Sequence, residues 1–289
     1  MNFDILNPKT ISELLQELKQ NQKQKFRFGA GYTDLLMELK RRPEENLTVI
    51  NLAQVKDVHL TEIKKLAKGY RLGAMLTAHK IVVNETLKVN FPVLQEAAHN
   101  LASNQIRQVA TLGGNLCTAS PSGDLSCALI ALQAQCEILA FNGKIRHVSI
   151  LDFFTGPRQT VLKPNEILYS VSIPAQENKT KTIQSRFIKI GTRRSMECSV
   201  VSLAYHLQLD GNGVILKAGI GIGASAPTVQ FPESACEFLI GKKFKAISER
   251  DKKEFAGLVL SYATPITDLR ATAWYRKEVL FNISKAIFE

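Results

Sequence analysis

Apolar and polar positions recur along the chain with two periodicities, one typical of helices and one typical of strands. Residues 10–13 have the form of a capping box, and apolar residues follow them at helical spacing. The alternating run 25–28 predicts a strand that ends in Gly29-Ala30-Gly31, and residues 33–40 predict a helix with an acidic first turn. Residues 47–52 predict a short buried strand. This order of helix, strand, turn, helix and strand predicts an α/β opening.

A second series of elements follows, and a polar segment closes it. The pattern predicts a strand beginning near residue 70, helices over 77–87 and 92–103, a hairpin formed by 136–141 and 144–150, and a strand over 166–174. The hairpin has a strong local signal, because Asn142-Gly143 suits the two-residue turn that joins antiparallel strands. Residues 175–182 are polar and lack apolar anchors. We therefore place a domain boundary there.

The second half of the chain is arranged differently. Strands are expected over 185–190, 199–209 and 214–223, and helices over 233–239, 248–262 and 274–288. Three strands followed by three helices describe a small α+β domain with a three-stranded antiparallel sheet. A chain of 289 residues also suits two domains of about 150 residues each. The prediction is an α+β protein with one domain over 1–176 and a second over 177–289.

Two glycine-bearing segments carry the candidate chemistry. The first is Gly29-Ala30-Gly31-Tyr32-Thr33-Asp34, which lies between a predicted strand and a predicted helix. Glycine lets a backbone approach a ligand closely, and free N–H groups at such a turn attract anions. The segment is neither a GxGxxG fingerprint nor a GxxxxGK[ST] loop, so it disfavours the dinucleotide and nucleotide-hydrolase sites that those motifs form.

The second segment, residues 111–125, places paired glycines, small hydroxyl side chains and one acid between two helical patterns. We interpret it as a loop, although structural loops of this length normally carry more charge. Small side chains around a backbone loop suit a large flat ligand with many polar edges. The hydroxyl groups and Asn115 could bond to a pyrophosphate, and Asp124 could accept hydrogen bonds from ribose or ribityl hydroxyls.

The two segments together resemble the FAD-binding medium subunit of the molybdenum hydroxylases, a family that includes xanthine dehydrogenase and carbon monoxide dehydrogenase. The resemblance is carried by Gly31-Tyr32-Thr33-Asp34 after a strand and by the run Ala110-Thr111-Leu112-Gly113-Gly114-Asn115-Leu116-Cys117-Thr118-Ala119-Ser120-Pro121-Ser122-Gly123-Asp124-Leu125. Residues 165–168, 187–189 and 274–276 extend it over the whole chain. It implies a two-lobed FAD-binding domain of the vanillyl-alcohol-oxidase (PCMH) type, followed by the family's C-terminal domain.

The resemblance also implies which residues bind the cofactor. Residues 30–34 and 111–115 would wrap the FAD pyrophosphate, three further residues would contact the cofactor, and Leu101, Leu168 and Lys189 would lie near the flavin. The full predicted set is Gly29, Ala30, Gly31, Tyr32, Thr33, Asp34, Leu101, Thr111, Leu112, Gly113, Gly114, Asn115, Thr118, Ser120, Asp124, Leu168 and Lys189.

Two members of this set have competing interpretations. Tyr32 stands where many relatives have glycine or asparagine, so a positive φ would strain it; otherwise its ring would shield the adenine side. Lys189 would favour the reduced, anionic flavin if it lies beside the ring. The alternative for Lys189 is an ordinary surface lysine on a strand.

For function, the resemblance implies an oxidoreductase: an electron-transfer flavoprotein that takes electrons from two [2Fe–2S] clusters of a small subunit and passes them to NAD or another external acceptor. A large subunit would carry the molybdenum cofactor and hydroxylate the substrate. The five scattered cysteines form no pattern that holds such a cluster in this chain. We expect no catalytic or metal-ligating residues of its own, no membrane partner and a cytoplasmic location, because neither a secretory signal nor a spanning segment is visible.

The charge balance of the chain raises alternative functions. The chain has 37 Lys and Arg against 26 Asp and Glu, and the surplus of +11 would suit nucleic acid, an anionic ligand, an acidic partner or a solvated surface. A nucleic-acid-binding module would need basic residues interleaved with aromatic residues on one face, whereas the lysines here are scattered. A self-sufficient flavin oxidase or dehydrogenase would need a general base, and none is evident. We therefore favour the flavoprotein subunit, with no nucleic acid as partner.

Overall fold

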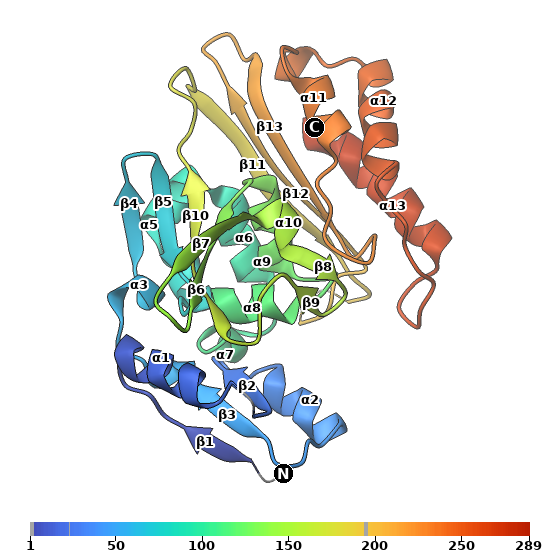
Figure 1. Ribbon diagram of the computed structural model, residues 1–289. Helices are drawn as coiled ribbons and strands as arrows, with labels where there is room; N and C mark the ends of the chain where they lie inside the picture. The colour runs from blue at the N-terminus through green and yellow to red at the C-terminus, as the bar shows by residue number, and fades with distance from the viewer. Residues whose placement is uncertain (1–2, 23, 194–195) are drawn as a thin grey trace.

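The chain folds into three parts that follow one another in sequence (Figure 1). The computed structural model describes residues 3–22, 24–193 and 196–289. The first two parts form two lobes, and the third is a sheet covered by helices. This arrangement confirms the predicted α+β fold, in which a two-lobed part precedes a three-stranded antiparallel sheet with helices.

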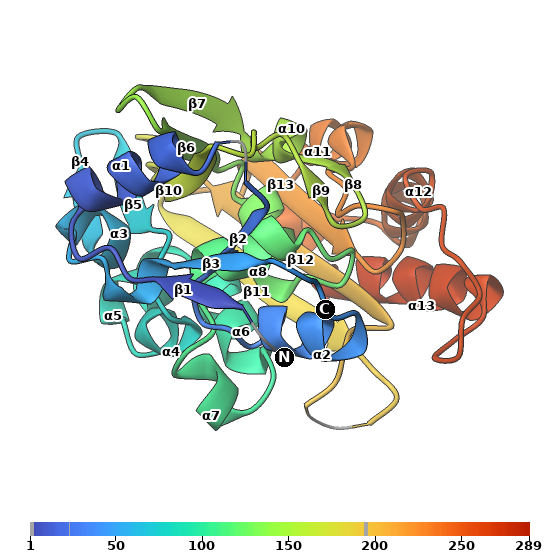
Figure 2. The ribbon, with the colours of Figure 1, turned by 60° about the horizontal axis from the view of Figure 1, so that its bottom comes forward.

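The first lobe is a small parallel sheet with two helices, and it faces the viewer in Figure 2. Its elements are β1 (Asp4–Leu6), α1 (Ile11–Gln20), β2 (Phe26–Gly29), α2 (Leu35–Arg41), β3 (Thr48–Asn51) and the 3-10 turn η1 (Leu52–Gln54). The strand order is β1-β3-β2, with both pairs parallel. Because β2 ends at Gly29, the first glycine segment lies at the carboxyl end of this sheet.

The second lobe is built on a five-stranded antiparallel sheet with the strand order β4-β5-β10-β6-β7. Its elements are α3 (Val58–Thr61), β4 (Ile63–Leu66), β5 (Gly69–Gly73), α4 (Ala78–Val82), α5 (Glu85–Asn90), α6 (Pro92–Asn100), α7 (Asn104–Arg107), α8 (Leu112–Thr118), α9 (Asp124–Ala131), β6 (Gln135–Ala140), β7 (Ile145–Ser149), α10 (Ile150–Phe153), β8 (Phe154–Gly156), β9 (Gln159–Thr160) and β10 (Glu166–Pro174). One large apolar core fills this lobe and extends into the first through Leu14, Leu18 and Ile50.

The third part is the antiparallel sheet β11-β12-β13 with helices on its outer face. Its elements are β11 (Thr182–Ile190), β12 (Val201–Leu209), β13 (Ile215–Gly223), α11 (Glu233–Leu239), the 3-10 turn η2 (Phe244–Ala246), α12 (Glu249–Leu260), α13 (Ala273–Lys285) and the 3-10 turn η3 (Ala286–Phe288). On the opposite face, α6 and α9 of the second lobe pack directly against the strands. The sheet is therefore covered by helices from two different parts of the chain.

A stripe of glycines on β13 makes that close packing feasible. Gly219, Gly221 and Gly223 recur at every second position, so they share one face of the strand. A Cβ at the first two would collide with the carbonyl oxygens of Ala131 and Cys127 on α9. The intervening isoleucines point into the core formed with α11–α13. The stripe thus brings the start of α9, and with it Asp124, against the third part.

Three local predictions differ from the structure. The helix expected over 77–87 is two short helices, because Asn84 accepts a hydrogen bond from the N–H of Leu87 and caps a new helix. The segment 111–125, expected as a loop, is helical over α8. The capping box at α1 forms only in part: Thr10 accepts from the N–H of Glu13, whose carboxylate instead accepts from Lys9.

A buried histidine joins the second lobe to the third part. The N–H of Val93 on α6 donates to the hydroxyl oxygen of Ser185 on β11, and that hydroxyl lies 3.0 Å from His206 Nδ1 on β12. The hydroxyl has a second lone pair and a proton of its own, so the tautomer of the ring decides which of the two groups donates in this contact. Burial, with a smaller contribution from Lys217, lowers the pKa of His206 to about 4.

Acid is therefore expected to loosen this junction. Between pH 6.5 and about pH 4 the unfolded chain binds a proton at His206 and the folded chain does not, so stability falls as the pH drops through this window. Chemical unfolding followed at several pH values would show this, with His206→Gln as the comparison. A variant whose pH dependence matches that of the unchanged chain would contradict the prediction.

Candidate functional site

The first glycine segment forms a tight turn between β2 and α2. Gly31 lies against the second lobe, because a Cβ there would collide with the carbonyl oxygen of Val109. Tyr32 adopts φ +60°, in the left-handed region that tyrosine rarely occupies. Its ring covers Gly29 and packs on the small core that includes Leu39. Of the two interpretations of Tyr32, backbone strain is the one that the structure shows.

This turn presents four consecutive backbone donors. Within the described part of the chain, no oxygen accepts a hydrogen bond from the N–H groups of Gly31, Tyr32, Thr33 or Asp34. All four residues are half-exposed. Successive N–H groups around a left-handed residue form a concave arrangement that binds anions. Because its four free N–H groups lie on half-exposed residues, this turn suits a phosphate or diphosphate.

The second glycine segment, in contrast, has no free backbone donors over residues 112–115. Its N–H groups are satisfied internally: Leu112 donates to Leu76, Gly113 to Ala74, and both Gly114 and Asn115 to Thr111. Thr111 is the N-cap of α8, so its hydroxyl accepts from Gly114 rather than pointing outward. Gly113 is required by packing, since a Cβ there would lie 2.9 Å from that of Ala74.

The groups of this segment that are available to a ligand belong to its side chains. The Oδ1 of Asn115 accepts from Ser126, which leaves its NH₂ group without a partner among the described residues. The hydroxyl of Thr118 likewise makes no hydrogen bond within the described ranges. Gly114 is half-exposed, and a Cβ there would meet only the Thr111 hydroxyl, at 2.8 Å. Ser120 accepts from the N–H of Ser122 in the turn that follows.

Most of the remaining predicted residues gather around a buried ion pair. Lys189 Nζ lies 2.7 Å from Asp124 Oδ2, with side chains 10% and 6% exposed. The ammonium also donates to the carbonyl of Asn100, next to Leu101, and Ser199 donates to the other Asp124 oxygen. Burial raises the pKa of Asp124, and the ammonium and the hydroxyl oppose that rise. Lys189 is therefore not an ordinary surface lysine.

The structure thus separates the predicted residues into two groups. Residues 29–34 and 111–120 form one group, because Gly31 packs on Val109 and Ala110, which directly precede the second segment. Leu101, Asp124 and Lys189 form the other. Leu168 is buried on β10 beside Tyr169, whose carbonyl accepts from Ala74 under α8. Ser199 was missed from the sequence because nothing in its neighbourhood signals a partner 75 residues away.

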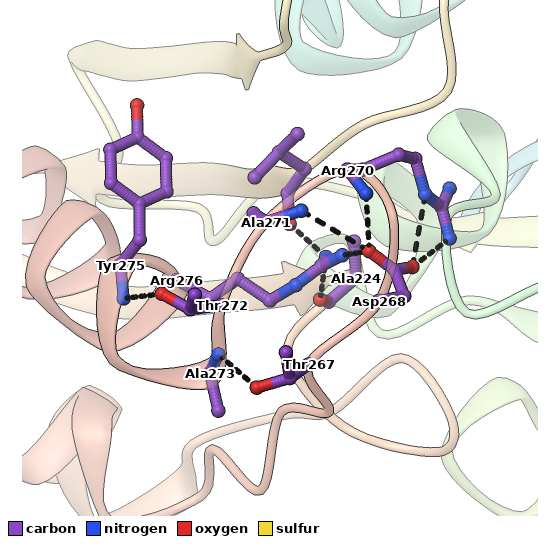
Figure 3. A network of polar contacts seen from close by, with 10 residues as sticks. Ala224, Thr267, Asp268, Arg270, Ala271, Thr272, Ala273, Tyr275 and Arg276 are labelled. Carbon is purple, nitrogen blue, oxygen red and sulfur yellow. Dashed lines mark hydrogen bonds and ion pairs between the residues drawn. The ribbon is translucent and has the colours of Figure 1, made fainter.

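The terminal pattern 274–276 proves to stabilise a loop (Figure 3). Arg276 is buried, and its guanidinium donates to the carbonyls of Val200 and Ala224 and to Asp268. Asp268 also accepts from Arg270. Although burial raises the pKa of Asp268, these hydrogen bonds bring it well below its usual range.

Arg276→Met is expected to lower the free energy of unfolding by about 2 kcal/mol, because two buried carbonyls lose their donor. Arg270→Met is the matched control: it removes an arginine from the same aspartate, but this side chain is 43% exposed. Its effect should stay below about 1 kcal/mol. Urea unfolding of both variants measures the difference, and equal effects would contradict the assignment.

Comparison with known proteins identifies the family. The family described as FAD binding domain in molybdopterin dehydrogenase matches residues 1–176, and the CO dehydrogenase flavoprotein C-terminal domain matches residues 186–289. The chain belongs to this FAD-binding family of molybdopterin dehydrogenases. It is accordingly a flavoprotein of an oxidoreductase family, and its cofactor is FAD.

Relatives of this family match along nearly the whole chain. The glyceraldehyde dehydrogenase medium chain of Sulfolobus acidocaldarius is 27% identical over 99% of this chain and 97% of its own length. The xanthine dehydrogenase FAD-binding subunit of Escherichia coli O157:H7 is 29% identical over 96% and 92%. Among solved structures, quinoline 2-oxidoreductase from Pseudomonas putida 86 superimposes with a TM-score of 0.87 at 26% identity, over 100% of this chain and 96% of the other.

The residues present fit the family's cofactor. FAD carries a diphosphate, which suits the four free N–H groups, and polar hydroxyl edges, which suit the free amide of Asn115 and the hydroxyl of Thr118. No helix in the described part of the chain is both long and apolar enough to cross a membrane. The same described residues contain no group of three or more His, Cys, Asp or Glu side chains arranged to hold a metal ion.

Proposed function

We propose that this chain is the FAD-binding electron-transfer subunit of a molybdenum-containing hydroxylase. Bound FAD supplies the redox chemistry, by accepting electrons from one partner and releasing them to another. The electron donor would be the [2Fe–2S] clusters of a small subunit, and the acceptor NAD or another external oxidant. A large subunit would hold the molybdenum cofactor. We further propose a cytoplasmic location and domains over 1–176 and 177–289.

The observation that carries the proposal is the run of free N–H groups at residues 31–34. These donors are half-exposed, so water can accept from them until a ligand replaces it, and four in sequence suit an anion that accepts several hydrogen bonds at once. A diphosphate is such a ligand. Tyr32 contributes through its left-handed backbone, which turns neighbouring N–H groups toward one concave surface. The strain is retained because the segment has this binding role.

The second segment would hold the cofactor differently from the first. Since the N–H groups of residues 112–115 are already bonded, its contribution comes from Asn115, Thr118 and Ser120 and from the bare surface at Gly114. Gly29, Leu112 and Gly113 act by packing these segments closely. Ala30, Thr33 and Asp34 complete the turn.

The second group of residues would lie at the flavin. Lys189 has three donors, and two of them are used by Asn100 and Asp124. The third is available to a flavin edge, and Leu101, which follows Asn100, would provide apolar surface nearby, whereas Leu168 would act from β10. Asp124 fixes the ammonium in place and reduces its net charge. This arrangement supports a role for Lys189 in orienting and tuning the cofactor.

The substrate is expected to be determined by another chain. The relatives that share this fold and length act, by their names, on glyceraldehyde, xanthine, nicotinate and carbon monoxide. Such different molecules have no common recognition chemistry, whereas an FAD site can be the same in all. The medium chains and FAD subunits among these relatives are named as parts of larger enzymes.

Titration of the full-length chain with FAD tests the proposal. FAD is expected to bind with quenching of its fluorescence, and riboflavin, which lacks the diphosphate, to bind far more weakly. Purification of the native assembly should then give flavin and iron–sulfur absorbance with two further subunits. A single chain that neither binds FAD nor assembles would refute the proposal. Turnover of a substrate by the single chain would instead favour a self-sufficient flavin enzyme.

A further inference from the structure

Arg158 lies between the two glycine segments, although neither contains it. It occupies the turn between β8 and β9, a hairpin that runs beside α8 (Figure 1). Its N–H donates to the carbonyl of Ala119 at 2.9 Å, between Thr118 and Ser120. Both Arg158 and Ala119 have positive φ, +59° and +47°, so two left-handed residues other than glycine meet at this point. The backbone of Arg158 is thus anchored to the second segment.

The side chain of Arg158 reaches the first segment. Its Nη1 lies 3.7 Å from Asp34 Oδ2 and 3.6 Å from Glu38 Oε2. Both distances exceed the hydrogen-bond range, and the guanidinium makes no hydrogen bond within the described part of the chain. Arg27, in contrast, bonds to Glu38 and Glu44 at 2.9 and 2.8 Å. Glu38 therefore already has a cationic partner, and Arg158 is not needed to neutralise it.

An exposed guanidinium with free donors thus stands beside four free backbone N–H groups. A guanidinium matches the oxygens of a phosphate in geometry as well as in charge. We propose that Arg158 is the side-chain cation of the diphosphate site and closes it from the second lobe. The inference rests on the proposed function, since it assigns one more residue to the same FAD site.

A different role for Arg158 has distinguishable consequences. If it only held the lobes together through Asp34 and Glu38, removal of either carboxylate would weaken the protein and FAD binding alike. If it binds the diphosphate, Asp34 is a nearby negative charge that opposes the ligand. Glu38, the other carboxylate beside Arg158, opposes it too, so Glu38→Gln should leave FAD affinity unchanged or raise it. The two roles predict opposite results from the same variant.

The experiment measures the affinity of the full chain for FAD, ADP and riboflavin at low salt. Arg158→Gln is expected to lose about 10- to 100-fold in affinity for FAD and ADP, the range for a hydrogen bond to a charged group, with unchanged thermal stability in the absence of ligand. Riboflavin binding should not change. Arg186→Gln is the matched control, because it removes an exposed arginine that pairs with Glu96 at 3.5 Å.

The outcomes separate this inference from the proposed function. If the unchanged chain binds FAD and Arg158→Gln binds it equally well, the role of Arg158 is refuted and the FAD site stands. If the unchanged chain binds neither FAD nor ADP, both fail. Should Arg158→Gln not fold, Arg158→Lys retains the charge without the fork of donors, and wild-type affinity for ADP in that variant would also overturn a bidentate role.

Discussion

Lys189→Met is expected to lower the free energy of unfolding by about 3–5 kcal/mol, because it leaves the carboxylate of Asp124 buried without its ammonium. The side chains of both residues are almost wholly inaccessible, so water cannot replace the lost partner. The pair also joins α9 of the second lobe to β11 of the third part. Its loss should therefore loosen the contact between these two parts.

A double-variant cycle isolates this interaction. Asp124→Leu combined with Lys189→Met removes both charges, and we expect it to recover much of the stability lost in the single variants. Lys64→Met, at an exposed strand position, is the matched control and should change stability by less than about 0.5 kcal/mol. Urea unfolding provides the measurement. A single variant as stable as the control would contradict a structural role for the pair.

The same variants separate stability from cofactor binding. If either Asp124 or Lys189 contacts FAD, the stable double variant should still bind FAD more weakly than the unchanged chain. Titration with FAD measures the combined contribution of the pair. Unchanged affinity in the double variant would remove both residues from the cofactor site and leave the pair a structural role alone.

Gly31→Ala is expected to destabilise the chain by about 3 kcal/mol and to reduce FAD affinity at least about tenfold. The added Cβ would collide with the carbonyl oxygen of Val109, and a backbone carbonyl cannot move aside as a flexible side chain can. The turn would have to shift away from the second lobe. Its four free N–H groups and the second segment would then no longer face one ligand.

Gly257→Ala provides the matched control for this change. Gly257 lies in α12 with nothing within 4 Å of an added Cβ, so the substitution should be neutral or slightly stabilising. Thermal unfolding and FAD titration of both variants, made in parallel, test the prediction. Wild-type FAD affinity in Gly31→Ala would show that the approach of the two segments is not needed for binding.

Much of the fold follows from local chemistry. The hairpin around Asn142-Gly143 forms where it was predicted, with Gly143 at φ +79°, but Ala140 bonds to Lys144, so the turn has three residues and not two. The strands of the third part keep their predicted places, since apolar runs bounded by turn residues need no distant partner to be recognised. The errors are also local in origin: Asn84 begins a second helix, and Thr111 begins one inside the expected loop.

The sequence by itself determined many of the elements, the two glycine segments and, through their resemblance to known flavoproteins, the family and its cofactor. Only the tertiary structure decided which donors in those segments are free. The N–H groups of residues 31–34 are available and those of 112–115 are not, because Leu76, Ala74 and Thr111 accept from the latter.

The tertiary structure also decided that Lys189 is paired with Asp124 and that Arg158 stands between the segments. These contacts join residues 65 and 124 positions apart. Hydrogen bonding and charge pairing depend on distance in space, and no periodicity along one chain encodes them. A pattern can therefore specify a strand or a turn, whereas the state of each donor and charge follows from how those elements pack.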